Sequence, residues 1–165
     1  MNELVHIITP FQNKLFRYAF RIVGDRMEAE DVIQELLIKI WKKKDQFIQI
    51  DNKEAWCMTL TRNMSIDKTR KKKYRTQNID DFHFIKDNAA SPYQSVESKD
   101  NLGRIETIIN GLSDKQKTVV HLRDVEGYSY KEISEISGFT VDQIKVYLHR
   151  ARVLLRKQIN RSDYE

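Results

Sequence analysis

Breaks in helical structure are rare along this sequence. Its 165 residues include only five Gly and two Pro, and alternation of the strand type is weak. Apolar residues instead recur at three- and four-residue steps, which is the spacing of one face of an α-helix. We therefore predict an all-α fold.

The first half of the chain predicts three helices, at about 4–23, 27–44 and 53–73. A Gly24-Asp25 turn separates the first two, and acidic residues open the second helix where its dipole favours them. One broad face of the second helix is apolar, with Val32, Ile33, Leu36, Leu37, Ile40 and Trp41. The core positions that we expect on the third helix are Ala55, Trp56, Leu60, Met64 and Ile66.

Residues 78–101 change character abruptly. They are acidic and rich in Asn, Asp and Ser, and 24 residues is long for a loop inside one compact domain. Their charge of −3 separates +6 over residues 1–77 from +2 over residues 102–165. We therefore predict two small helical domains, 1–77 and 102–165, joined by a flexible acidic linker.

The second half predicts a helix-turn-helix. A helix ends near Gly111, Ser113 caps the next, and Val119, Val120, Leu122 and Val125 supply that helix's apolar side. A short helix with Ile133 and Ile136 in the core then runs to Gly138. Thr140 caps a longer helix from Val141 to about Gln158. A short helix, a tight turn and a longer helix with basic residues are typical of this DNA-binding motif.

Polar residues follow the outer side of the last helix. They are Gln143, Lys145, Tyr147, His149, Arg150 and Arg152, opposite an apolar stripe formed by Ile144, Leu148, Ala151 and Leu155. Gln and Arg suit base edges, while Lys and Arg suit phosphates. A plain helical hairpin with an amphipathic final helix would explain the same pattern without DNA.

A dense basic cluster ends the third helix. Arg62, Lys68, Arg70, Lys71, Lys72, Lys73 and Arg75 oppose only Asp67. Such a cluster is the usual footprint of nucleic-acid binding, although a solvated helix end also carries charge runs. Asp67 either contacts DNA or pairs with Lys71 at the i+4 position.

The sequence offers no sign of catalysis, metal or cofactor. Cys57 is the single cysteine, which excludes a disulfide within the chain or a cysteine-cluster metal site, and we expect it to be buried. The four histidines are scattered, and no nucleophile elbow or phosphate-binding loop is present. No apolar run reaches the roughly 20 residues needed to span a bilayer, and the first residues lack a secretion signal. We expect a cytoplasmic, non-enzymatic protein.

Four stretches of the chain, in order, resemble the extracytoplasmic-function (ECF) group of the sigma-70 family of RNA polymerase sigma factors. They run from Gly24 to Trp41, from Ala55 to Lys73, from Leu112 to Ile133, and from Val146 to Arg152. The resemblance covers nearly everything except the linker.

This resemblance implies how each stretch works. The second helix, whose polar side carries Asp31, Gln34, Glu35 and Ile38, would dock on the β′ clamp helices of core RNA polymerase. Asn63, Asp67, Arg70 and Lys71 would contact the −10 promoter element, and a loop at about 47–52 would hold a flipped base. The last helix would read the −35 element beside the β flap. The implied inhibitor is an anti-sigma factor, which in this group is usually at the membrane.

Three other functions fit parts of the pattern. A stand-alone helix-turn-helix regulator would bind duplex DNA without polymerase. A small nuclease would need metal-binding acids, and Glu28, Glu30, Asp31 and Glu35 superficially supply them. A protein-interaction module would carry its basic charge incidentally.

Overall fold

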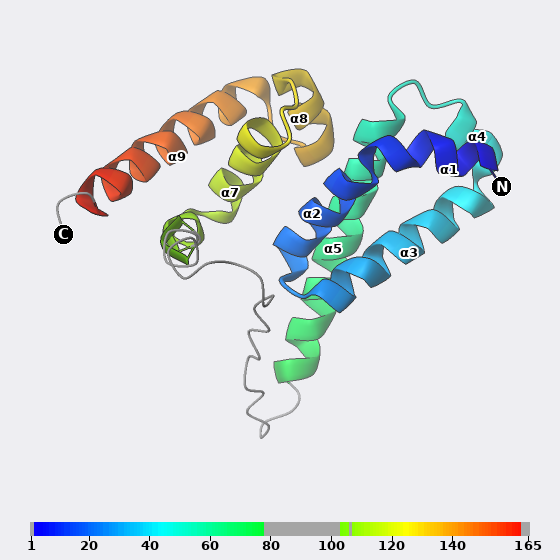
Figure 1. Cartoon of the computed structure of the whole chain (residues 1–165), viewed down its shortest axis with the longest axis horizontal. Coiled ribbons are helices and arrows are strands. Elements are labelled where there is room, and N and C mark those ends of the chain that lie inside the picture. The colour runs from blue at the N-terminus through cyan, green and yellow to red at the C-terminus, as the bar shows by residue number, and fades with distance from the viewer. Residues whose placement is uncertain (1, 78–102, 106, 163–165) are drawn as a thin grey trace, which may run out of the picture. The chain divides into compact units, whose positions relative to one another are not determined.

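The computed structural model describes residues 2–77, 103–105 and 107–162, and all regular structure in these ranges is helical (Figure 1). The chain divides into two compact units, residues 1–80 with 131–138 and residues 81–130 with 139–165. The all-α prediction is confirmed. The linker predicted at 78–101 lies outside the described residues, and the domain boundaries remain a prediction.

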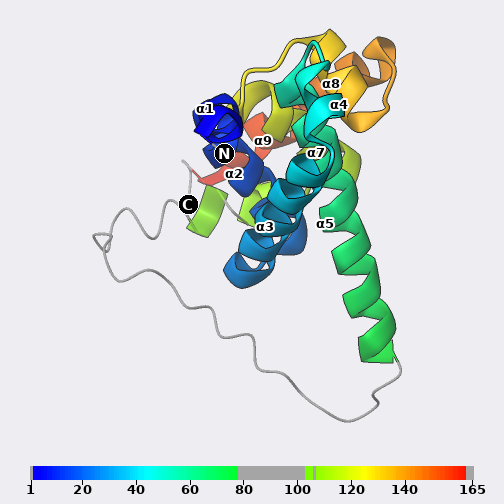
Figure 2. The ribbon, with the colours of Figure 1, turned by 90° about the vertical axis from the view of Figure 1, so that its right-hand side faces the viewer.

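Three long helices build the first unit. They are α2 (Gln12–Val23), α3 (Arg26–Lys42) and α5 (Lys53–Gln77), and each packs against the other two. Leu15 and Ala19 of α2, Leu36 of α3 and Met58 of α5 are fully buried. Figures 1 and 2 show α3 and α5 side by side, with the last turns of α5 running beyond the start of α3. The basic end of α5 is therefore presented to solvent.

The single helix expected at 4–23 is wrong, because Pro10 interrupts it. The chain forms α1 (Asn2–Ile8), then a 3-10 turn, η1 (Thr9–Phe11), and only then α2. Proline lacks the backbone N–H of a helix interior, and its ring clashes with the preceding turn. Gly24, at φ +73°, ends α2, and the Asp25 carboxylate accepts a hydrogen bond of 2.9 Å from the Glu28 N–H to begin α3.

The expected core of α5 is only partly right. Ala55 is buried, but Trp56, Leu60, Met64 and Ile66 are half-buried. The fully buried positions are Cys57, Met58, Thr61 and Ser65. Met58, Thr61 and Ser65 follow one another at three- and four-residue steps, and two of these side chains are small. The neighbouring helices approach this narrow stripe, which leaves the larger residues on its flanks.

Part of the loop expected at 47–52 is a helix, α4 (Lys44–Ile48). Phe47 is fully buried, and its ring centroid lies 5.6 Å from that of Trp56. Asn52 then caps α5, because its side-chain oxygen accepts a 3.0 Å hydrogen bond from the Ala55 N–H. A loop for a flipped base would therefore begin after Ile48.

The second unit is organised around α7 (Asp114–Val120) and α9 (Val141–Ser162), which pack together. Before them, residues 103–105 and 107–110 are helical. Ser113 and Gln116 form the expected capping box at the start of α7, with reciprocal hydrogen bonds of 3.0 and 3.3 Å. Ile144, Leu148 and Ala151 of α9 are buried as expected, and Leu155 is half-buried.

A π-helical turn, η2 (His121–Val125), follows α7 and corrects one expected core position. The Glu126 N–H donates to the His121 carbonyl five residues earlier, at 3.0 Å. The extra residue in this turn rotates the helix, so that Val125 is 56% exposed while His121 and Glu126 are buried. A 3.6-residue period could not predict that rotation.

The short helix α8 (Tyr130–Ser137) carries Ile133 and Ile136, and both are buried as expected. Gly138 ends it at φ +78°, with its N–H donating to the Ser134 carbonyl at 2.9 Å. Such a positive φ strains any residue with a Cβ, which accounts for glycine at this turn. The helix, turn and helix order predicted from the sequence is therefore present.

We expect the fold to lose stability in alkaline solution. Burial raises the pKa of the Cys57 thiol and that of the Tyr18 phenol to about 12. Both groups are neutral when protonated, so their contribution is complete below their ordinary pKa values of 9.0 and 10.0 and is lost as the pH rises toward 12. Urea unfolding between about pH 8 and pH 11 measures this slope. Cys57→Ala should flatten it, and an unchanged slope would contradict this explanation.

Candidate functional site

The outer face of α3 exposes all four residues predicted to dock a partner. Asp31, Gln34, Glu35 and Ile38 are exposed, whereas Val32, Leu36 and Ile40 on the opposite side are buried. Ile38 is 52% exposed, although it is a large aliphatic side chain. The helix therefore presents a mixed acidic and apolar surface, which we call the α3 face.

Trp41 belongs to this exposed side and was wrongly placed in the core. It is 52% exposed, three residues beyond Ile38, so the two apolar side chains lie one turn apart. Apolar periodicity alone predicts that Trp41 is buried with Ile40. The three-residue step from Ile38 is the sequence signal that would have placed it on the α3 face.

The basic end of α5 presents the residues predicted to contact DNA. Asn63, Asp67, Arg70 and Lys71 are all exposed, at steps of four, three and one residues that keep them on one side of the helix. Among the described residues, Asp67 forms no ion pair with Lys71, so the local pairing considered for it is absent. Sequence reasoning missed Tyr74, which is 71% exposed and continues this side by one turn. An exposed aromatic ring between cations is a stacking surface for bases.

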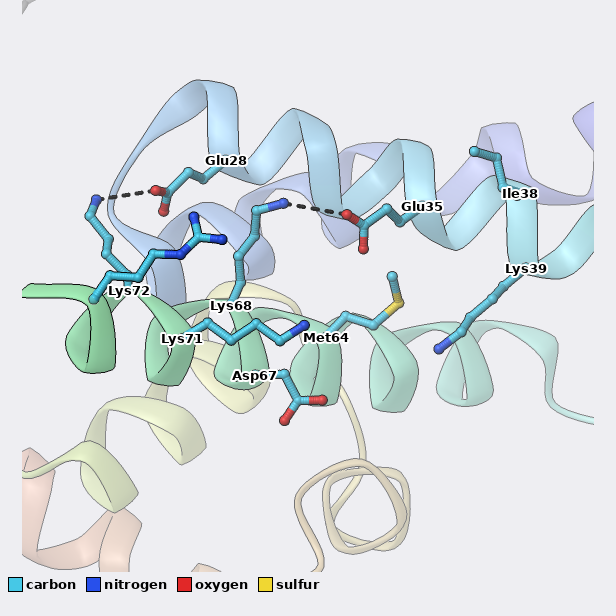
Figure 3. A pocket seen from close by; sticks show the side chains of 10 residues that line it. Glu28, Glu35, Ile38, Lys39, Met64, Asp67, Lys68, Lys71 and Lys72 are labelled. Atoms are coloured by element: carbon cyan, nitrogen blue, oxygen red, sulfur yellow. Dashed lines mark hydrogen bonds and ion pairs between the residues drawn. The ribbon is translucent and has the colours of Figure 1, made fainter. Parts of the chain in front are cut away.

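Among the described residues, three ion pairs join α3 to α5, and Figure 3 shows two of them, Lys72 with Glu28 and Lys68 with Glu35. Lys68 Nζ lies 3.7 Å from an Asp31 carboxylate oxygen and 3.5 Å from one of Glu35. Lys72 Nζ lies 3.1 Å from Glu28. Two acids of the α3 face are therefore partly neutralised by a lysine of α5. Helical periodicity cannot predict such pairs, because the partners are more than 30 residues apart.

A groove of about 580 Å³ lies between the same two helices (Figure 3). Ile38 and Met64 supply its apolar walls. Its charged lining consists of Lys39, Lys68, Lys71, Lys72 and Arg75 against Glu28, Glu35 and Asp67. The groove carries a surplus of positive charge, which favours an anionic occupant.

The outer side of α9 carries the six residues predicted to read duplex DNA. Gln143, Lys145, His149 and Arg150 are exposed, and Tyr147 and Arg152 are half-buried. The four exposed residues lie within the first three turns of α9. In a helix-turn-helix, the beginning of the second helix enters the major groove.

Arg152 and Tyr147 also make side-chain contacts within their own unit. Arg152 donates to the Asp124 carboxylate at 2.6 and 3.3 Å, and this hydrogen bonding raises the pKa of Arg152. The Tyr147 ring packs edge-on against Phe139 at 5.3 Å, with Lys115 5.8 Å from its centroid. These contacts hold both side chains in place, so they are less free than Lys145 and Arg150 to follow a base edge.

Gln143 has a structural role that the sequence reading missed. Its side-chain oxygen accepts from the Thr140 N–H at 3.0 Å, and the Thr140 hydroxyl accepts from the Gln143 N–H at 3.2 Å. This is a capping box, which satisfies two N–H groups at the start of α9. The Thr and Gln at a three-residue offset were the signal for it. The side-chain amide nitrogen of Gln143 remains able to donate to a base.

We expect Thr140→Ala to destabilise the second unit by about 1 kcal/mol, because it removes the hydroxyl of this capping box. Thr140→Ser keeps a capping hydroxyl and serves as the matched control. Urea unfolding of both variants measures the difference. Equal stability of the alanine and serine variants would show that the cap contributes nothing.

Potential metal ligands do not cluster in the described structure. Among residues 2–77, 103–105 and 107–162, no group of three or more His, Cys, Asp or Glu side chains could hold a metal ion. The acids considered for a nuclease site instead make contacts of their own, such as the pair between Glu30 and Arg26 at 3.1 Å. No described helix is both long enough and apolar enough to cross a membrane. Cys57 is buried, as expected.

Comparison with protein families gives two matches in the order of the chain. The model described as Sigma-70 region 2 matches residues 7–75, which contain α2, α3, α4 and most of α5. The model described as Sigma-70, region 4 matches residues 102–155, which contain α7, α8 and the first part of α9. The α3 face and the basic end of α5 thus lie in the first match, and the polar side of α9 lies in the second.

Individual relatives are similar over most of their length. The ECF RNA polymerase sigma factor SigW of Bacillus subtilis is 31% identical over 163 residues, covering 93% of this chain and 87% of SigW. SigL of Mycobacterium tuberculosis, also an ECF sigma factor, is 31% identical over 147 residues, covering 86% and 80%. A solved complex of the sigma factor RpoE with the anti-sigma factor NepR from Bartonella quintana contains a similar chain, with a TM-score of 0.77 and 26% identity over 97% of this chain and 98% of RpoE.

Proposed function

The chain belongs to the ECF group of sigma-70 RNA polymerase sigma factors and is a transcription initiation factor, and we propose that it docks on core polymerase through α3 while α5 and α9 contact promoter DNA. The observation that carries this proposal is the pair of family matches, in order and on the two stretches that bear the charged surfaces. We assign docking and −10 contacts to residues 1–77, a linker to 78–101, and −35 contacts to 102–165.

Docking is proposed for the α3 face. Asp31, Gln34, Glu35 and Ile38 are exposed together on a helix whose other side is buried, so they can meet a partner without disturbing the core. By family resemblance, we propose the β′ clamp helices of the polymerase as the partner. Trp41 lies next to these residues and is also exposed. Aromatic residues are enriched among the side chains that anchor protein interfaces, so we include Trp41 in the docking surface.

DNA contacts are proposed for two separate surfaces. On α5, Asn63, Asp67, Arg70 and Lys71 would meet the −10 element, where polymerase opens the duplex. On α9, Lys145, His149 and Arg150 would reach the −35 element first, with Gln143 donating through its amide and the anchored Tyr147 and Arg152 at the edge. By the same resemblance, we propose that the second domain lies beside the β flap.

Regulation and chemistry are proposed to lie outside this chain. RNA synthesis belongs to the polymerase, so the chain itself would catalyse nothing and would act in the cytoplasm, where polymerase and promoters are. RpoE of Bartonella quintana was solved with an anti-sigma factor, and we propose that a protein of this kind also inhibits the present chain. A stand-alone regulator is not favoured, since it leaves the region 2 match unexplained.

Mixing the purified chain with bacterial core RNA polymerase tests the proposed function. We expect a stoichiometric complex on size-exclusion chromatography and little binding of the free chain to duplex DNA. A chain that ignores core polymerase but binds a DNA operator tightly would contradict the sigma role and indicate a regulator.

A further inference from the structure

The π-helical turn η2 contains a pair of ionisable side chains inside the second unit. His121 and Glu126 are both buried, and Nε2 of the imidazole lies 3.4 Å from Oε1 of the Glu126 carboxylate. Neither residue belongs to the proposed docking or DNA surfaces. A buried charge is costly unless an opposite charge neutralises it, so the carboxylate favours a protonated imidazole beside it. The two side chains form an ion pair only while His121 carries its second proton.

The pair depends on the π-helical geometry of the turn. In a regular α-helix, two residues five apart lie about 140° from each other around the helix axis, on different faces. Here the Glu126 N–H donates to the His121 carbonyl at 3.0 Å, so a backbone hydrogen bond and a side-chain pair link the same two residues. Regular α-helical hydrogen bonding of this turn would separate the two side chains. The pair and the π-helical turn therefore stabilise each other.

The outer residues of η2 hold the segments that follow it. Asp124 accepts two hydrogen bonds, of 2.6 and 3.3 Å, from Arg152 of α9. Arg123 donates to the Tyr128 carbonyl at 2.8 Å, and its guanidinium lies 4.8 Å from the ring centroid of Tyr130, the first residue of α8. A change in the hydrogen-bonding pattern of η2 would rotate its side chains about the helix axis and release these contacts. The rotation of η2 therefore controls how firmly α9 is held.

The elements that pack on η2 bring further ionisable groups to it. Lys117 of α7 is half-buried, and its carbonyl accepts from the His121 N–H one turn later. Arg152 of α9 and the phenol of Tyr130 meet the outer side of the turn through the contacts above. Lys117 and Arg152 are cations, which oppose a proton on His121, whereas Glu126 favours it from 3.4 Å. Protonation of His121 therefore depends on the Glu126 carboxylate.

We propose that His121 and Glu126 are positioning residues for −35 recognition, and that their charged pair holds η2 in the rotation that lets Asp124 anchor Arg152. The inference rests on the proposed function, because α9 carries the proposed −35 contacts. The positioning is complete below about pH 6.5, where an ordinary histidine is protonated. It is lost at higher pH as the imidazole loses its proton, because the buried carboxylate is then unpaired. Recognition of the −35 element therefore weakens in mildly alkaline solution.

NMR titration of the histidine rings in the free chain tests whether the pair is charged. We expect His121 to keep its proton to a pH roughly one unit or more above the value for exposed His6, because an opposite charge at this distance has an effect of that size. Glu126→Gln removes the opposite charge and keeps the shape, so His121 should then lose its proton at a lower pH. A wild-type imidazole that is neutral at about pH 6, or a titration that is unchanged in Glu126→Gln, would overturn the proposal. If Glu126→Gln fails to fold, wild-type His121 against His6 still decides the point.

Binding of core polymerase plus the chain to two promoter duplexes, one with an intact and one with a scrambled −35 element, tests the positioning role. For the wild-type chain, the ratio of the two affinities should fall by up to about tenfold between about pH 6 and pH 8.5, as one pH unit of differential proton binding allows. His121→Gln/Glu126→Gln replaces the pair with two neutral amides that can still hydrogen-bond, and it should flatten this dependence. His6→Gln is the matched control and should follow wild type. His149 of α9 is present in every variant, so its own protonation does not account for the difference.

The possible outcomes separate this inference from the proposed function. If the double variant keeps the pH profile of wild type, the pair does not act on −35 recognition and the positioning role is wrong. If wild type shows no preference for the intact −35 element at any pH, the proposed −35 contacts are wrong, and the positioning role fails with them. The ring titration needs neither polymerase nor DNA, so it decides in either case whether the pair is charged.

Discussion

Replacing Gln34 and Glu35 with alanine should abolish the stoichiometric complex with core RNA polymerase. Both residues are exposed on α3 beside Ile38, and neither contributes to the buried core. Interface residues at the centre of a docking surface commonly cost 2 kcal/mol or more when truncated, which weakens binding by about thirtyfold. Titration of labelled chain with core polymerase measures the loss.

A chemically matched control separates docking from a general loss of charge. Asp45→Ala/Gln46→Ala removes one acid and one amide from α4, where both side chains are exposed and lie outside the α3 face. This control should bind core polymerase like wild type. Urea unfolding should show that both double variants remain folded. If the two variants bind polymerase equally well, the docking surface lies elsewhere on the chain.

Replacing Arg70 and Lys71 with alanine should have the reverse effect, leaving the polymerase complex intact while preventing promoter opening. Both side chains are exposed on α5, and neither belongs to the buried core. Each cation lost from a phosphate contact removes about one unit from the salt slope, so the double variant should lose about two. We expect promoter opening to fall at least about tenfold at moderate salt, because the double variant loses two phosphate contacts and the binding energy that they supply.

Opening is read from the fluorescence of 2-aminopurine in the −10 element of a promoter duplex. The matched control is Lys157→Ala/Arg161→Ala, which removes the same charges from the exposed far end of α9. That variant should open the promoter like wild type. An Arg70/Lys71 variant that opens promoter DNA as well as this control would remove α5 from the −10 assignment.

Local signals in the sequence predicted much of this fold. Ser113 and Gln116, the two turns at Gly24 and Gly138, and the buried stripe of α9 are each encoded within a few neighbouring residues. Capping and positive φ depend on the chemistry of one or two side chains, so they can be read without tertiary structure. The same reasoning could have found the Thr140–Gln143 box.

The remaining features depend on how helices meet. Trp41 was assigned to the core because apolar residues were grouped by period, but the neighbouring helices cover only part of the apolar side of α3. On α5 the small Thr61 and Ser65 are fully buried, whereas the larger Leu60 and Ile66 are only half-buried. The π-helical turn at His121–Val125 rotates the helix so that Val125 is exposed. None of these outcomes follows from propensity.

In the candidate site too, some features follow from local sequence and others depend on how the helices pack. Periodicity predicted that Asp31, Gln34, Glu35 and Ile38 would be exposed together, and they are. It could not predict that Lys68 would bridge Asp31 and Glu35, since this depends on the packing of α3 against α5. Tyr74, which is 71% exposed, lies within the basic cluster, and a prediction made from charge alone does not include it.

The central claim is that this chain gives core polymerase its promoter specificity, and transcription in vitro tests it most directly. Core polymerase alone and core polymerase with the chain would be compared on genomic DNA of the source organism, with mapping of RNA 5′ ends. We predict discrete start sites that require the chain and share sequence elements at −10 and −35. Start sites that are the same with and without the chain would contradict the account.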